Sequence, residues 1–263
     1  MRTLALVRDL QRMCVAVPFL LPKIRYNHSM QTKELVRLQK YLAQRGFGSR
    51  RKLEIMIAGG NITVNGVKAH LGIKVTGDED IRINGKTIEI KDVSPVVYAV
   101  NKPAGVVSTV SDEHKRKTVC DLVSSDLRLF PVGRLDIDTS GLILLTNDGD
   151  LAQRLTHPKY EVEKEYILTL AEPLSPQQID QITSGIDDDR DSFHVDKVEI
   201  TGKTSYNLVL HEGKKREIRR IMAYVGADLI SLKRIRIGSL QLGTLKEGEY
   251  KELSQSELNL LSR

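Results

Sequence analysis

The sequence has few of the residues that build metal, redox and membrane sites. Tryptophan is absent, aromatic residues make up 5% of the 263 residues, and there are two cysteines, Cys14 and Cys120. Two cysteines so far apart match no zinc or redox spacing, so we expect reduced thiols in a cytoplasmic protein. No run approaches the roughly 18 apolar residues of a membrane-spanning helix, so no membrane partner is predicted.

The charge balance points to a polyanionic partner. The chain carries 40 Lys and Arg against 34 Asp and Glu, a net charge of +6, and a pI of about 9.2. A basic balance of this kind favours nucleic acid but does not prove it. Alternating acids at Asp187, Asp189 and Asp191 do not form a calcium loop, because Ser192 stands where the loop needs glycine. We therefore predict no metal and no organic cofactor.

The first 34 residues differ from the rest of the chain. Residues 1–29 are rich in Arg and Lys, contain a single acid, Asp9, and have an apolar patch broken by Pro18 and Pro22. A transit peptide has this charge pattern but usually more serine. The alternative is a disordered or non-native extension upstream of a start at Met30. We take residues 1–34 as such an extension.

Residues 35–91 predict a small basic domain. Helical spacing follows Leu35 and stops at Gly46, Ser49 caps a second helix, and Asn65-Gly66 marks a hairpin turn. Seven Lys or Arg and one acid lie between positions 33 and 52. The pattern fits a solvated basic face, and it equally fits a grip on a phosphate backbone. The candidate RNA contacts are Arg37, Lys40, Ser49, Arg50, Arg51 and Lys52.

A longer motif occupies positions 133–149. It opens with Gly-Arg-Leu-Asp, which sets Asp136 beside Arg134, and continues into an apolar run of strand length, 142–145. A polar loop on an apolar strand is a common way to build a site. Two other interpretations are open, namely ordinary Asp, Thr and Ser turn chemistry and an Asp-x-Asp phosphatase loop. The phosphatase loop requires Thr where Ser140 stands.

Two further segments carry candidate residues. The stretch 160–168 alternates as a strand, with Lys164 and Tyr166 on one face. The run 212–222 is strongly basic and has helical spacing; by itself it is compatible with a solvated helix face. Its candidate RNA contacts are Lys214, Lys215 and Arg216.

Together these motifs resemble the pseudouridine synthases that modify single uridines of ribosomal RNA. The resemblance implies that Asp136 is the catalytic residue and that Tyr166, in Lys-x-Tyr, stacks on the target base. It also implies that Ile218 packs beneath the site, that Arg219 pairs with Asp136, and that Arg134 helps to hold the flipped nucleotide or its phosphate. The sequence has Glu217 where this family usually has Gln. Residues 35–91 resemble the S4-type RNA-binding domain, named for a small-subunit ribosomal protein.

The expected fold is α+β. A small α/β RNA-binding domain (35–91) precedes a catalytic domain (96–253) with a mixed, mainly antiparallel sheet and flanking helices, and 254–263 is a polar tail. We expect a monomeric enzyme that converts one uridine of ribosomal RNA into pseudouridine after base flipping. Between the two ribosomal subunits, we favour the large one as the source of that uridine. The alternative is a non-catalytic, RNA-binding ribosome-assembly factor. Which uridine is modified, and whether Asp136 attacks the sugar, attacks the base or removes a proton, stay open.

Overall fold

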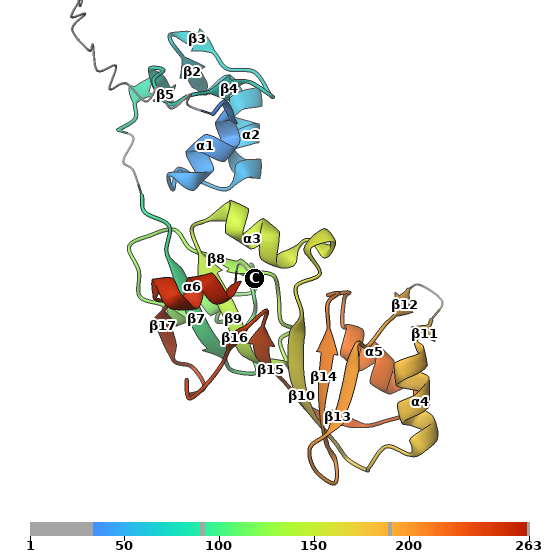
Figure 1. The fold of residues 1–263 in the computed structure, drawn as a ribbon. Helices are drawn as coiled ribbons and strands as arrows, with labels where there is room; N and C mark the ends of the chain where they lie inside the picture. The colour runs from blue at the N-terminus through green and yellow to red at the C-terminus, as the bar shows by residue number, and fades with distance from the viewer. Residues whose placement is uncertain (1–33, 90–92, 189–190, 262–263) are drawn as a thin grey trace, which may run out of the picture. The chain divides into compact units, whose positions relative to one another are not determined.

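The computed structural model describes residues 34–89, 93–188 and 191–261, so the expectation for residues 1–33 lies outside the described residues. The N-terminal domain contains two short helices and two small sheets, with strand orders β1-β4 and β3-β2-β5-β6 (Figure 1). Its elements are β1 (Val36–Arg37), α1 (Leu38–Gln44), α2 (Arg50–Ala58), β2 (Ile62–Val64), β3 (Val67–Lys68), β4 (Lys74–Val75), β5 (Ile81–Ile83) and β6 (Lys86–Thr87).

The local signals in this domain are confirmed. Gly46 adopts a positive φ of 85° just after α1, and the Ser49 hydroxyl accepts a 3.2 Å hydrogen bond from the Lys52 backbone N–H at the start of α2. Asn65 and Gly66 both have positive φ, as the tight β2–β3 hairpin requires. The two helices contribute four buried residues to one core that they share with the small strands, namely Leu38, Leu42, Leu53 and Ile57.

The second domain is built on a nine-stranded sheet. Its central path is β13-β14-β10-β15-β9-β7-β17, with β8 on β9 and β16 on β15. Its elements are β7 (Val97–Lys102), η1 (Val119–Leu122), β8 (Phe130–Val132), β9 (Ser140–Thr146), α3 (Gly149–Thr156), η2 (Pro158–Tyr160), β10 (Lys164–Leu170), α4 (Pro176–Ser184), β11 (Ile186–Asp187), β12 (Ser192–Phe193), β13 (Lys197–Ile200), β14 (Ser205–Leu210), α5 (Glu217–Tyr224), β15 (Leu229–Ile237), β16 (Leu240–Gln241), β17 (Tyr250–Glu252) and α6 (Gln255–Leu261).

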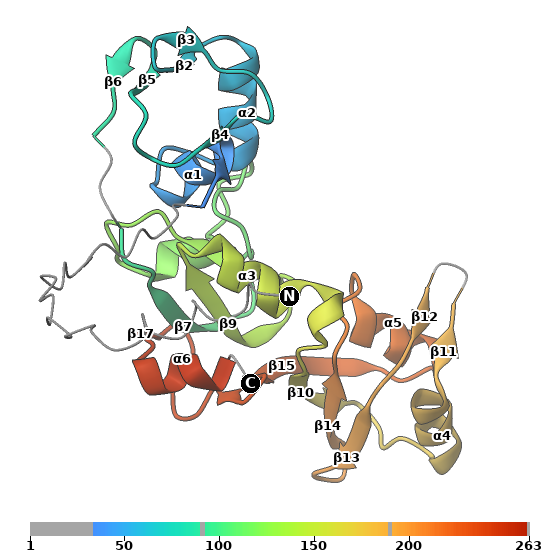
Figure 2. The ribbon, with the colours of Figure 1, turned by 45° about the horizontal axis from the view of Figure 1, so that its top comes forward.

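This sheet is mainly antiparallel, as the sequence predicted. Among its described strand pairs, β9 and β15 run parallel, and they share two residue pairs, Ser140 with Lys233 and Gly141 with Arg234. Helices α4 and α5 pack at the β13–β14 end, and α3 lies at the β7–β9 end (Figure 2). β9 is buried on both faces, because Leu142 and Leu144 join one core and Ile143 and Leu145 another.

The prediction of a polar tail after residue 253 is wrong. Residues 255–261 form α6, and Leu261 is buried in the same core as Leu142 and Leu144. A reciprocal cap starts this helix, since the Ser254 backbone N–H donates to the Glu257 carboxylate and Glu257 N–H donates to the Ser254 hydroxyl. The sequence Ser254-x-x-Glu257 followed by an apolar pair three residues apart, Leu258 and Leu261, is a signal for the start of a helix. The prediction gave more weight to the polar composition of the segment than to this signal.

Candidate active site

The loop that carries Asp136 is fixed at both ends. It runs from β8 to β9, and Leu135 and Thr139 are buried, whereas Asp136 between them is half-buried. The Thr139 backbone N–H donates to the Asp136 carbonyl at 3.0 Å, which closes a turn. Since its neighbours are held in the protein, the backbone at Asp136 is fixed, and the half-buried side chain remains accessible to a ligand.

A buried lysine holds the same loop from β7. Lys102 is fully buried, and its ammonium donates to the carbonyls of Val106 (2.8 Å), Pro103 (2.9 Å) and Ile137 (3.4 Å). Burial lowers the pKa of Lys102 to about 8, while the nearby carboxylates of Asp138 and Asp136 act in the opposite direction. The two carboxylates therefore favour the charged form of Lys102, against the effect of burial.

Arg219 reaches this loop from α5, but not in the predicted way. Its guanidinium donates through Nη2 to the Asp138 carbonyl at 3.0 Å and to the Thr139 hydroxyl at 3.4 Å. The ion pair expected between Arg219 and Asp136 does not occur among the ion pairs formed by the described residues. The spacing of motifs indicates which segments meet, whereas the choice between a backbone oxygen and a side-chain oxygen depends on the packing of α5.

Tyr166 lies where two hydrophobic cores meet. It is half-buried on β10 and packs against both the core that contains Ile218 and the core that contains Leu135. Asp136 follows Leu135 and Arg219 follows Ile218 in the chain, so the structure brings these three predicted residues into one region. Ile218 itself is buried, as predicted.

Arg234, on β15, is not among the residues that the sequence analysis singled out. It is 5% exposed, donates through Nε to the Leu142 carbonyl at 2.7 Å, and approaches the Tyr166 hydroxyl with Nη1 at 3.5 Å. The backbone of Arg234 lies so close to the paired strand β9 that a Cβ built on Gly141 would lie 2.2 Å from the Arg234 carbonyl oxygen. A glycine immediately after a site loop is the signal that could have indicated this close approach.

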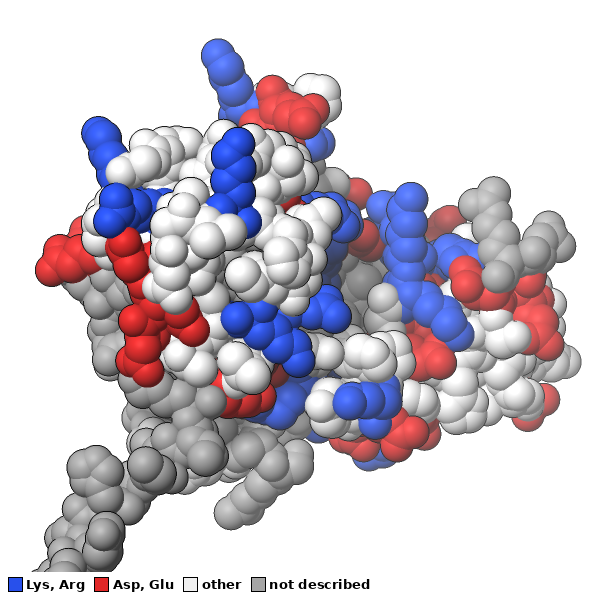
Figure 3. Space-filling model, turned by 90° about the horizontal axis from the view of Figure 1, so that it is seen from above, with Lys and Arg blue, Asp and Glu red and all other residues white. Residues whose placement is uncertain are grey.

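The predicted RNA contacts differ in accessibility. Arg134, Lys215 and Arg216 are exposed, whereas Lys214 is half-buried and forms an ion pair with Glu212. In the N-terminal domain Lys40 is half-buried, and the exposed members are Arg37, Ser49, Arg50, Arg51 and Lys52. On the face drawn in Figure 3, Lys and Arg side chains project between acidic ones.

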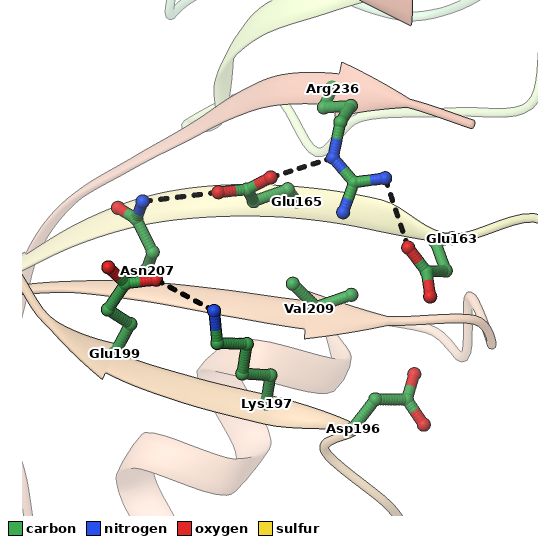
Figure 4. Close-up of a pocket in the computed structure, with 8 residues that line it drawn as sticks. All are labelled: Glu163, Glu165, Asp196, Lys197, Glu199, Asn207, Val209 and Arg236. Carbon is green, nitrogen blue, oxygen red and sulfur yellow. Dashed lines mark hydrogen bonds and ion pairs between the residues drawn. The ribbon is translucent and has the colours of Figure 1, made fainter. Parts of the chain in front are cut away.

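A hollow of about 240 Å³ lies on the face of the sheet that carries Glu165 (Figure 4). The next residue, Tyr166, lies on the other face, because side chains alternate along β10. The charges of the hollow are largely paired, because Arg236 contacts Glu165 at 2.7 Å and Glu163 at 3.0 Å, and Lys197 contacts Glu199 at 3.0 Å. With Asp196, four carboxylates face two cations there. This acidic excess disfavours phosphate, so we expect RNA to meet the Tyr166 face.

Two kinds of site are not found in the described parts of the chain. No group of three or more His, Cys, Asp or Glu side chains in the described residues could hold a metal ion. Likewise, none of the helices in residues 34–89, 93–188 and 191–261 is long and apolar enough to cross a membrane.

A carboxylate loop held by a buried cation, a neighbouring tyrosine and a separate small basic domain together agree with the family matches. A family model described as RNA pseudouridylate synthase matches residues 96–224, and one described as S4 domain matches residues 36–81. The chain belongs to the RNA pseudouridine synthase family and carries an N-terminal S4 domain. It is therefore an isomerase.

Individual relatives agree with this placement. The chain is 39% identical to "Ribosomal large subunit pseudouridine synthase B" of Bacillus subtilis, over 86% of this chain and 95% of that protein. It is 35% identical to "Dual-specificity RNA pseudouridine synthase RluF" of Escherichia coli, over 85% and 77% of the two chains. A solved structure, "Crystal structure of pseudouridylate synthase", aligns with a TM-score of 0.63 at 30% identity, covering 86% of this chain and 99% of its own.

Proposed function

We propose that this enzyme converts a single uridine of ribosomal RNA into pseudouridine, with Asp136 as the acting carboxylate. The main support is the convergence of Lys102, Arg219 and Tyr166 on the Asp136 loop from three separate elements. The name of the Bacillus subtilis relative favours RNA of the large ribosomal subunit, and the S4 domain favours an RNA substrate. Membership of an enzyme family favours this interpretation over the assembly-factor alternative.

The reaction requires the uracil to turn within the site. The bond from ribose carbon 1′ to nitrogen 1 of uracil breaks, the base turns, and a bond forms from the same ribose carbon to carbon 5. Carbon 5 then loses its proton and nitrogen 1 gains one, so the product is an isomer of the substrate. A uridine inside a helix cannot reach the loop, so it is flipped out of the stack. The Tyr166 ring then stacks on the extruded base, an interaction of about 1–3 kcal/mol. Exposed Arg134, next to Leu135, is placed to contact the phosphate of the flipped nucleotide.

The target RNA is tested by deleting the gene and mapping pseudouridines in both ribosomal RNAs. We expect one position of large-subunit RNA to lose its modification and to regain it when the gene is restored. Loss at a small-subunit position would refute the subunit assignment. An unchanged map of both RNAs would refute ribosomal RNA as the substrate.

The S4 domain is expected to supply much of the salt-sensitive affinity. Replacing Arg50, Arg51 and Lys52, all exposed on α2, with Gln removes up to three phosphate contacts. The logarithm of the RNA association constant falls linearly with the logarithm of the salt concentration. Each lost contact reduces the magnitude of this negative slope by about 0.7–0.9, so the slope is expected to become shallower by about 2. Filter binding across a salt titration measures it.

Lys74 and Lys86 provide the control for this experiment. Both are exposed in the same domain but lie on the strands β4 and β6 rather than on α2. Their replacement with Gln is expected to leave the slope within about 0.5 of the wild-type value, less than one phosphate contact. Equal slopes for the α2 variant and the wild type would show that α2 does not bind the backbone.

A further inference from the structure

Glu217 is a buried acid at the start of the helix that carries Arg219. It is 7% exposed, and it is the first residue of α5. Its Oε2 accepts a 3.1 Å hydrogen bond from the Lys214 backbone N–H, whereas its Oε1 is buried without a hydrogen-bond partner. An ionised carboxylate would leave half of its charge on that unpartnered oxygen, which is costly.

The start of α5 depends on this side chain. Arg216, the residue before the helix, has a positive φ of 55° and no side-chain cap. The carboxyl of Glu217 instead folds back to Lys214 and closes the turn that leads into the helix. The next two residues are Ile218, buried in the core beneath Tyr166, and Arg219, which holds the Asp138 carbonyl. A displacement at Glu217 therefore moves the residue that holds the Asp136 loop.

The charged groups around Glu217 mostly have partners of their own. From the preceding segment, Lys214 forms an ion pair with Glu212, and the His211 ring contacts Asp196 at 2.8 Å. From β10, Lys164 donates to the His211 carbonyl at 3.2 Å. Burial, as the largest effect, and the Glu212 carboxylate together raise the pKa of Glu217 to about 7, against the lowering by the Lys214 N–H, the Lys214 ammonium and His211.

We propose that Glu217 is a positioning residue, and that its protonated form holds the start of α5 so that Arg219 fixes the Asp136 loop. A proton on Oε1 makes the group neutral and leaves Oε2 free to accept from Lys214. Loss of the proton places an uncompensated charge at the helix start and loosens the hold of Arg219 on the loop. This proposal deepens the site proposed above, since it assigns to that site a dependence on one buried proton.

The Glu217→Gln variant tests the proposal because its amide is neutral at every pH and has nearly the same shape. Single-turnover pseudouridine formation is measured from pH 6 to pH 9 on ribosomal RNA from the deletion strain. We expect equal rates for the variant and the wild type at pH 6 and a wild-type rate about tenfold lower than the variant at pH 8, with RNA affinity unchanged. A tenfold difference is what a group with a pKa near 7 gives one unit above it.

Glu199→Gln is the matched control. Glu199 is exposed on β13, pairs with Lys197, and lies on the opposite face of the sheet. This variant is expected to keep the wild-type pH profile. Parallel profiles for Glu217→Gln and the wild type would overturn the proposal. The pH profiles of Glu217→Gln and the wild type compare rates of product formation, and this comparison does not depend on which carboxylate performs the chemistry. Failure of the Glu217 proposal is therefore distinguishable from failure of the Asp136 assignment.

A second measurement does not depend on the variant. The Glu217 carboxyl carbon of the wild-type protein is followed by NMR during a pH titration. Because the pKa in the folded state is raised, stability is fully present below the ordinary value near 4.5 and is lost as pH rises towards 7. We therefore expect the Glu217 carboxyl to titrate with a midpoint near pH 7. We also expect the urea concentration at the midpoint of unfolding to fall as the pH rises from 4.5 towards 7. A carboxyl midpoint near 4.5 would overturn the proposal.

Discussion

Replacing Asp136 with Asn is expected to abolish pseudouridine formation, a loss of at least about 10⁴-fold, because the amide has almost the same shape but no charge and no basicity. RNA affinity is expected to stay within about threefold of the wild-type value, since most of the affinity comes from phosphate contacts elsewhere. The measurement is chemical mapping of ribosomal RNA from the deletion strain after incubation with the purified variant.

Asp138→Asn is the control from the same loop. Asp138 is exposed, and the hydrogen bond that it makes to Arg219 uses its backbone carbonyl rather than its side chain. We expect its rate to fall by less than about tenfold, as suits the loss of a nearby charge without a direct chemical role. If Asp136→Asn still modified the RNA, or if Asp138→Asn were the inactive variant, the assignment of Asp136 would be wrong.

Replacing Gly141 with Ala is expected to be the most destabilising small substitution near the site. The added Cβ would lie 2.2 Å from the Arg234 carbonyl oxygen and 2.6 Å from its backbone nitrogen, and the φ of 105° is itself unfavourable for alanine. Backbone atoms cannot move aside as the end of a long side chain does. We expect a loss of about 3 kcal/mol or more in the free energy of unfolding, measured by urea denaturation.

Gly149→Ala shows what the same change does where there is space. Gly149 is the first residue of α3, a Cβ added to it would have no atom within 4 Å, and its φ is not positive. Because alanine favours a helix over glycine by about 0.5–1 kcal/mol, this variant is expected to be as stable as the wild type or slightly more stable. Equal free energies of unfolding for the two alanine variants would contradict the close approach of the paired strands β9 and β15 at Gly141.

The sequence predicted the parts of this protein whose signals are local. Ser49 as a helix cap and the Asn65-Gly66 turn were each predicted from a few neighbouring residues. The strand around Tyr166 was predicted in the same way, although it begins at Lys164 rather than at Tyr160, which lies in a short 3-10 helix. The buried position of Ile218 followed from the motif in which it lies.

The remaining features depend on contacts between distant residues. Lys102 donates to the Ile137 carbonyl, and Arg234 donates to the Leu142 carbonyl, over separations of 35 and 92 residues. Carbonyl groups are present at every position, so the sequence does not mark which of them a buried cation will reach. For the same reason the predicted partner of Arg219 was wrong in detail, although the segment that it reaches was right.

The place of β15 in the sheet has a consequence for biosynthesis. β15 lies between β10 and β9, although it follows both in the chain and ends at Ile237. Before the ribosome has released residues 229–237, β9 and β10 therefore have open edges where β15 will pair. Such long-range pairing is slow compared with helix formation. The pairing of β15 with the start of β9, directly after the Asp136 loop, therefore forms only once residues 229–237 have left the ribosome, so a truncated chain that ends before β15 lacks this support for the loop.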